Sequence, residues 1–181
     1  MWKKRKEIKD EDRVIKDPER SRKKTFDRAV NLLTYKPRSI TELRERLLEK
    51  PWTDHQIVEE VIEKLKKYNY LNDEQFAKDF AASKLRQKAV GKKRLRMDLI
   101  KKKLDRETIE RALEETFDET SEGELIDRAI AKRLRIKGRP EDQSDRKKFF
   151  DHLMRLGFSY DTVRDKMREV MSGDFDQDGD R

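Results

Sequence analysis

Large hydrophobic residues recur at one fixed spacing in three separate stretches of this 181-residue chain. Counted from the first position of each stretch, they stand at offsets 0, 4, 9, 14 and 18. The three sets are Leu43, Leu47, Trp52, Ile57 and Val61; Leu95, Leu99, Leu104, Ile109 and Leu113; and Phe149, Leu153, Phe158, Val163 and Met167. Their first positions lie 52 and 54 residues apart, and such a period indicates a tandem array of structural repeats.

The offsets describe two helices joined by a turn. A four-residue step places two side chains on one helix face, so each stretch holds two such pairs with one hydrophobic residue between them. Directly after that residue, each stretch carries a type that caps helix N-termini: Thr53, Asp105 and Ser159. Thr53 with Gln56 fits a capping box, and so does Ser39 with Glu42. Each repeat is therefore predicted to contain a helix–turn–helix pair that stacks on its neighbour to bury its core.

A further helix is expected before each pair. Its hydrophobic residues are Phe26, Ala29, Val30 and Leu33; Phe76, Phe80 and Leu85; and Leu125, Ala129, Ile130 and Leu134. Asn72 and a capping box from Ser121 to Glu124 mark the starts of the second and third of these helices. No run alternates with a period of two for long enough to indicate a strand. The sequence thus predicts an all-α fold of nine helices in three tandem three-helix repeats.

The predicted boundaries follow from composition and from the repeats. The N-terminal residues mix both charges with few apolar residues and include Pro18, and the last residues are rich in Asp, so both ends are interpreted as tails. The predicted segments are a disordered basic arm at 1–24, repeats at 25–70, 71–119 and 120–171, and an acidic tail at 172–181.

Composition is consistent with an elongated array. Only 33% of the residues are hydrophobic and 48% are charged, so the surface must be large relative to the core. The absence of cysteine excludes disulfides and thiolate metal sites. No apolar run approaches the ~18 residues that span a membrane, and the basic N-terminus lacks the apolar stretch of a secretory signal. We therefore expect a soluble cytoplasmic protein.

No constellation of residues indicates an enzyme, a metal site or a cofactor site. His55 and His152 lie in different helix pairs and have no Cys or second His nearby. Gly91-Lys92 lacks the earlier glycine and the strand of a phosphate-binding loop. Part of the C-terminal tail matches the first half of a calcium loop, but the bidentate Glu is missing: Asp174, Asp176, Asp178 and Gly179.

Positive charge is concentrated in two places. Between Lys84 and Arg106, eleven Lys and Arg residues stand against two Asp, a net charge of +9, whereas the whole chain carries +8. Further along the chain, basic residues recur at helical spacing and predict a stripe opposite Ile126, Ile130 and Leu134. Such surfaces attract polyanions. The candidate binding residues are Lys84, Arg86, Lys92, Lys93, Arg94, Lys101, Lys102, Arg128, Lys132, Arg135 and Arg139.

Two other interpretations remain open. These basic residues could form solvated helix faces without a ligand, with Arg94 and Asp98 as an ordinary i, i+4 ion pair. A membrane-surface helix is disfavoured because the apolar faces are committed to the repeats. Between Lys84 and Arg106 there are no aromatic residues on which bases could stack, which favours contact with phosphates or with acidic protein over base readout.

Several stretches resemble a known family. Tyr70–Ala77, followed by Gly91–Leu95 and Leu99, resembles the signature of the RecX family, whose members regulate the RecA recombinase. Ser39–Leu43 and Leu156–Ser159 resemble the matching segments of that family's first and third repeats.

The similarity extends from about Phe26 to Val170. The glycine that usually follows Lys at the turns of the first two repeats is absent here, where Pro51-Trp52 and Leu104 stand instead. These departures change the geometry of the two turns and so affect how the repeats stack on one another.

The resemblance implies a function and a shape. It implies a curved body that lies in the helical groove of the RecA–DNA filament and mostly inhibits recombinase, ATPase and co-protease activity in DNA repair, homologous recombination and the SOS response. No cofactor is expected, because no group of residues indicates one. We expect a monomer that contacts RecA and single- or double-stranded DNA through the basic residues named above. The alternatives are a stand-alone helical-repeat protein that binds nucleic acid without sequence specificity, and a scaffold whose charges only aid solubility.

Overall fold

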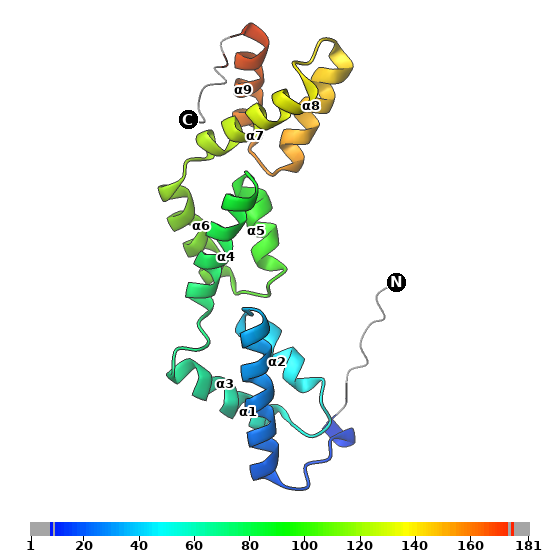
Figure 1. Ribbon diagram of the computed structural model, residues 1–181, viewed down its shortest axis with the longest axis vertical. Coiled ribbons are helices and arrows are strands. Elements are labelled where there is room, and N and C mark those ends of the chain that lie inside the picture. The colour runs from blue at the N-terminus through cyan, green and yellow to red at the C-terminus, as the bar shows by residue number, and fades with distance from the viewer. Residues whose placement is uncertain (1–7, 9, 174, 176–181) are drawn as a thin grey trace. The chain divides into compact units, whose positions relative to one another are not determined.

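The computed structural model describes residues 8, 10–173 and 175, and over these residues the chain is helical and contains no strand (Figure 1). A short 3-10 helix at Asp10–Asp12 comes first. It is followed, in the described part, by α1 (Pro18–Tyr35), α2 (Ile40–Leu48), α3 (His55–Lys67), α4 (Asp73–Gln87), α5 (Lys92–Ile100), α6 (Arg106–Glu119), α7 (Glu122–Lys137), α8 (Gln143–Arg155) and α9 (Tyr160–Ser172). The predicted all-α class is confirmed. None of these helices is both long enough and apolar enough to cross a membrane.

Capping side chains set most of the helix starts. Ser39 accepts a hydrogen bond from the Glu42 backbone N–H at 3.1 Å, and Asp105 and Ser159 cap α6 and α9 in the same way, as predicted. The predicted cap Thr53 is wrong by one residue, because Asp54 accepts from the backbone of α3 instead. The Thr53 side chain is buried and accepts a hydrogen bond from the Thr25 hydroxyl at 3.0 Å.

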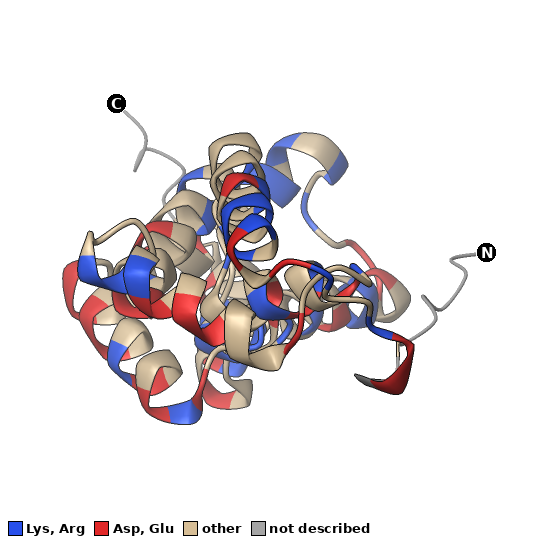
Figure 2. Ribbon diagram, turned by 90° about the horizontal axis from the view of Figure 1, so that it is seen from below, with Lys and Arg blue, Asp and Glu red and all other residues tan. Residues whose placement is uncertain are grey.

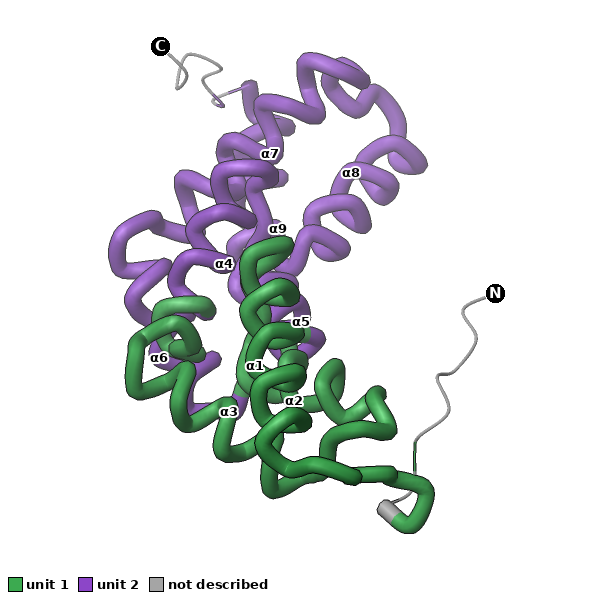
Figure 3. The backbone as a smooth tube through the Cα atoms, turned by 60° about the horizontal axis from the view of Figure 1, so that its bottom comes forward, with its two compact units in different colours: residues 1–76, 102–104 green, residues 77–101, 105–181 purple. Residues whose placement is uncertain are grey.

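The described residues form two compact units (Figure 3). The first extends to Phe76 and also contains the turn Lys102–Leu104; the second contains the rest of the chain from Ala77 onward. In the first unit α1 packs against α2 and α3, and in the second α5 packs against α6 and α7 against both α8 and α9. The predicted boundaries between the three repeats remain a prediction.

The repeated hydrophobic positions form the cores of the units. Leu43, Leu47 and Val61 are buried together with Ala29, Val58, Ile62, Leu65 and Leu71. In the second unit Leu95, Leu99, Leu113, Leu153 and Phe158 are among the largest fully buried side chains. Of the three predicted sets, every member is buried except Trp52, which is only half-buried. Val30, expected on the packed face of α1, is 40% exposed.

The predicted disorder of residues 1–24 is wrong for the part that the structure describes. Helix α1 begins at Pro18, because the Asp17 side chain accepts from the Arg20 backbone N–H and Pro18 occupies the first helical position. Pro18 and the mixed charges were interpreted as signs of disorder, but Asp17 followed by Pro18 is a helix start signal. Residues 1–7 and 9, and most of the predicted acidic tail, lie outside the described residues.

One mode of contact recurs between successive repeats. The start of a repeat's second helix docks on the turn between the second and third helices of the next repeat. In the first unit the Ser39 hydroxyl donates to the Lys102 carbonyl at 2.5 Å. In the second unit the backbone N–H of Gly91 donates to the Leu156 carbonyl at 3.0 Å, and that of Lys93 donates to the Gly157 carbonyl at 3.2 Å.

The corresponding turn of the first repeat is covered by the preceding segment of the chain. The Arg13 guanidinium donates to three carbonyls of this turn, and the Val14 backbone N–H donates to the Pro51 carbonyl at 2.9 Å. The three carbonyls that Arg13 contacts belong to Leu48, Lys50 and Thr53. Arg13 and Val14 therefore supply the hydrogen bonds that the turns of the later repeats receive from the repeat before them.

Candidate basic interaction surface

Three predicted residues, Arg128, Lys132 and Arg135, lie exposed on α7, and we name them the α7 stripe. The opposite face of the helix carries Ile126 and Ile130, which are fully buried. Because the apolar face is held in the core, the basic face points to solvent. Within the described residues, no carboxylate forms an ion pair with any of the three side chains. The α7 stripe is therefore a surface of uncompensated positive charge.

The fourth predicted member of this helix face, Arg139, lies outside it. Helix α7 ends at Lys137, and Gly138 follows with a φ of 73°, a backbone conformation that favours glycine. Arg139 instead donates through Nη1 to the Val170 carbonyl at 3.3 Å. The four-residue step from Arg135 to Arg139 would place both side chains on one helix face, but α7 ends at Lys137, before Arg139.

A second group of predicted residues gathers around Asp98, whose side chain is 15% exposed. Its carboxylate lies 3.6 Å from Lys84 Nζ of α4, 3.7 Å from Arg94 Nε and 3.5 Å from Lys101 Nζ. The structure thus brings together three predicted residues that are up to 17 positions apart in the sequence. One carboxylate faces three cations, so this cluster keeps a net positive charge.

Carboxylates from other elements neutralise part of the predicted basic segment. Lys102 belongs to the first unit, where its ammonium lies 3.2 Å from Glu42 and only 17% of its side chain is exposed. Lys103 pairs with Glu45, and Arg96 pairs with Glu110 at 2.5 Å. Basic and acidic residues are accordingly interspersed along the helices (Figure 2). The available charge of this segment is smaller than its sequence suggests.

The remaining predicted residues lie at the ends of α4 and α5. Arg86 and Lys93 are exposed, and no carboxylate among the described residues pairs with either. Lys92 is half-buried, and its backbone N–H donates to Glu122 Oε1 at 3.1 Å. Arg86 and Lys93 are therefore better placed than Lys92 and Lys102 to meet a polyanion.

A basic cleft at the end of α7 was not among the predicted sites. The cleft has a volume of about 260 Å³, and its walls include Arg133, Lys137 and Lys148. The Arg133 guanidinium lies 5.2 Å from the centre of the Phe149 ring, a cation–π contact between α7 and α8. The four-residue step from Arg133 to Lys137 was visible in the sequence as a second basic line beside the α7 stripe.

Neither histidine lies in a group that could hold a metal. Among the described residues, no three His, Cys, Asp or Glu side chains come together in that way. His55 begins α3 and His152 lies on α8, in different units. The calcium half-loop of the tail lies outside the described residues.

Comparison with known proteins gives the family. Residues 26–65 match the model of the first three-helix domain of RecX, and residues 72–113 match that of the second. The regulatory protein RecX of Prosthecochloris aestuarii is 32% identical over 150 residues, which cover 83% of this chain and 95% of that protein. The regulatory protein RecX of Bacillus velezensis is 34% identical over 149 residues, covering 82% of this chain but only 56% of the length of its relative.

Solved structures agree on the fold. The crystal structure of RecX from Lactobacillus salivarius superposes with a TM-score of 0.69 at 23% identity, covering 85% of this chain and 99% of that one. A second crystal structure of a regulatory protein RecX has a TM-score of 0.68 at 21% identity. With the sequence relationships above, these matches show that the chain belongs to the RecX family.

Proposed function

We propose that this protein binds the RecA–DNA filament and modulates, mostly by inhibition, its recombinase, ATPase and co-protease activities. Membership in a family of regulatory proteins supports a regulatory role without catalytic turnover of its own. The observation that carries the proposal is the α7 stripe, an exposed row of cations without ion-pair partners among the described residues. The filament offers both DNA phosphates and protein carboxylates to such a row.

The Asp98 cluster, with Arg86 and Lys93, provides further positive charge in the same unit. Cations that face phosphates release counterions on binding, which strengthens association at low salt. A protein bound across neighbouring subunits of a filament opposes the conformational changes that turnover of the filament requires, since it binds the assembled state better than the released one. Inhibition then follows from binding alone.

The test reverses two charges of the α7 stripe. Lys132 and Arg135 are exposed and lie away from the buried face of α7, so Lys132→Glu with Arg135→Glu should leave the fold intact. We expect this double variant to bind a RecA–DNA filament more weakly and to inhibit its ATP hydrolysis less. The matched control is Lys3→Glu with Lys4→Glu, which changes the net charge by the same amount in the N-terminal arm and should matter less.

Pull-down with purified recombinase, with and without single-stranded DNA and nucleotide, separates the proposal from its alternatives. Binding that requires the recombinase supports a filament regulator. Equal binding to bare DNA, with no effect of the recombinase, supports a stand-alone nucleic-acid-binding protein. Full inhibition by the double variant would show that the α7 stripe is a solvated face.

A further inference from the structure

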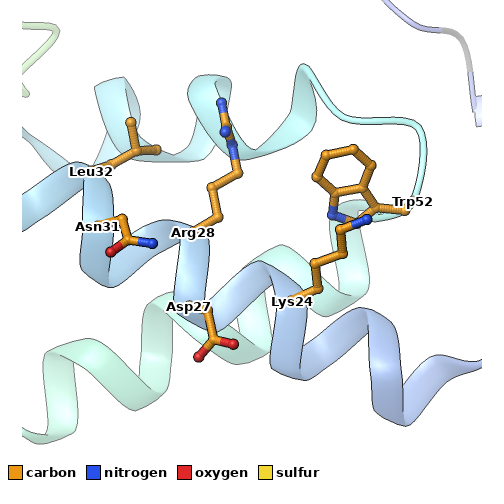
Figure 4. A pocket seen from close by; sticks show the side chains of 6 residues that line it. All are labelled: Lys24, Asp27, Arg28, Asn31, Leu32 and Trp52. Carbon is orange, nitrogen blue, oxygen red and sulfur yellow. The ribbon is translucent and has the colours of Figure 1, made fainter.

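A cleft in the first unit, lined by none of the residues considered so far as ligand contacts, has the features of an anion site. Its volume is about 340 Å³, at the lower end of the range for small-molecule sites. It lies between one face of α1 and the turn that follows α2 (Figure 4). The lining residues are Lys24, Asp27, Arg28, Asn31, Leu32 and Trp52.

Two hydrogen-bond donors in this cleft are buried and unsatisfied. Nε of Arg28 and Nε1 of Trp52 are inaccessible to solvent, and neither has a hydrogen-bond partner among the described residues. Nearly all buried polar groups in folded proteins are paired, so each exception requires an explanation such as a bound water or ion. Arg38, Arg96 and Arg133 also hold an unpaired buried Nε, but this cleft has two unpaired donors in its lining, and a shift of either side chain would turn its N–H toward an acceptor bound there.

The charge of the cleft has the matching sign. The Lys24 ammonium lies 3.7 Å from the centre of the Trp52 ring, and that of Lys50 lies 5.5 Å from it. Neither lysine forms an ion pair with a carboxylate of the described residues, and the same holds for Arg28. Asp27 is the acidic residue of the lining, and its side chain points away from Trp52 (Figure 4). The cleft is therefore a cationic site rich in donors.

We propose that this cleft binds a phosphate group. The side chains of Lys24, Arg28 and Asn31 line the cleft with donors from α1, and the buried Trp52 N–H becomes a further donor where a ligand shifts the indole. Such a set suits the several oxygens of a phosphate better than the two oxygens of a carboxylate. The volume leaves room for the ester substituents of a phosphodiester. The site explains why Trp52, alone among the repeated hydrophobic positions, is not buried. It is independent of the recombinase, because it requires only phosphate chemistry.

Two sources of phosphate fit, and Trp52 itself can distinguish them. The chain contains two tryptophans, so Trp2→Phe leaves Trp52 as the sole fluorescent indole. Titrating this variant with inorganic phosphate and, separately, with a short oligothymidylate should give a saturable change in emission. Saturation by the oligonucleotide alone identifies a nucleic-acid backbone as the source, and saturation by inorganic phosphate identifies the free anion; either supports the site.

Variants of α1 test whether the cleft is responsible. In the Trp2→Phe background, Arg28→Gln and Lys24→Gln should each weaken binding by about tenfold, the effect of losing one charge-assisted hydrogen bond. Lys24 is exposed, so its replacement keeps the fold, and circular dichroism checks the same for Arg28. The matched control is Lys23→Gln, which removes an equal charge from the neighbouring exposed position and should change affinity by less than about twofold.

Two results would overturn the proposal. The first is the absence of a saturable change with both probes. The second is equal weakening by Lys23→Gln and Lys24→Gln, which would mean that general electrostatic attraction accounts for the binding.

Discussion

Leu99 is fully buried in the second unit, on the apolar side of α5. Replacing it by alanine removes buried methyl and methylene groups and leaves a cavity that neighbouring helices fill only partly. We expect Leu99→Ala to lower the free energy of unfolding by about 2–5 kcal/mol. Denaturant unfolding followed by circular dichroism measures the change.

Met97 provides the control on the same helix, because its side chain is 52% exposed. Met97→Ala should change stability by less than about 0.5 kcal/mol. Similar losses for both variants would indicate that α5 is not anchored through Leu99.

His152 should make the protein less stable in mild acid. Burial lowers the pKa of His152, and the charges of Arg133, Arg155 and Lys88 lower it further. The unfolded chain therefore takes up this proton more readily than the folded one. The stability that depends on neutral His152 is fully present above the unfolded pKa of about 6.5, and it is lost as the pH falls below that value toward the lower pKa of the folded state.

We expect His152→Gln to reduce the loss of stability across this pH window, measured by urea unfolding at a series of pH values. Identical pH profiles for the parent and His152→Gln would contradict the assignment.

The start of α5 lies in close contact with the turn between α8 and α9. A Cβ atom at Gly91 would lie 2.4 Å from the Gly157 carbonyl oxygen, so backbone would have to move. The φ of Gly91 is −80°, which any residue adopts, and the cost of a side chain there is therefore one of packing. We expect Gly91→Ala to lower the unfolding free energy by about 1–3 kcal/mol.

Gly123 in the first turn of α7 is the matched control. A Cβ atom there would meet nothing closer than the Ser121 hydroxyl at 3.8 Å. Gly123→Ala should therefore stabilise the protein, by up to about 1 kcal/mol, because alanine favours the helix. Thermal unfolding of both variants compares the two effects, and a neutral Gly91→Ala would contradict the close approach.

Elements differ in how well local sequence predicts them. The starts of α2, α6 and α9 were predictable because a cap and its target lie three residues apart. Thr53 was predicted to cap α3, but its hydroxyl is hydrogen-bonded to Thr25 of α1, 28 residues away in the sequence, and Asp54 is the N-cap instead. Arg139 was misplaced because Gly138 ends α7, and the spacing of basic residues contains no information about the end of a helix.

For the whole molecule, the proposed function predicts a strong dependence of filament binding on salt. A plot of the logarithm of affinity against the logarithm of salt concentration should fall with a slope of roughly 0.7–0.9 per phosphate contacted. Lys132→Glu with Arg135→Glu should flatten this slope, because fewer counterions are released on association. Binding isotherms at several salt concentrations measure it, and a slope unchanged by the double variant would place the contact surface elsewhere.

The amino-acid sequence was enough to predict the helical class and the hydrophobic positions of the core. Both depend on local spacing, since side chains four residues apart share a helix face whatever the rest of the chain does. It also determined the family, through Tyr70–Ala77 and Gly91–Leu95, which fall largely within the matched second domain.

Which charges remain available for binding depends on contacts that form when the chain folds. Lys102 and Glu42 are 60 residues apart, and their ion pair removes a predicted contact residue that no local pattern could have excluded. The same holds for the cleft at Trp52, whose other lining residues, on α1, stand 20 to 28 positions earlier in the sequence. Ion pairs and clefts form between segments that the chain brings together only on folding, so their chemistry depends on distances in space and not along the sequence.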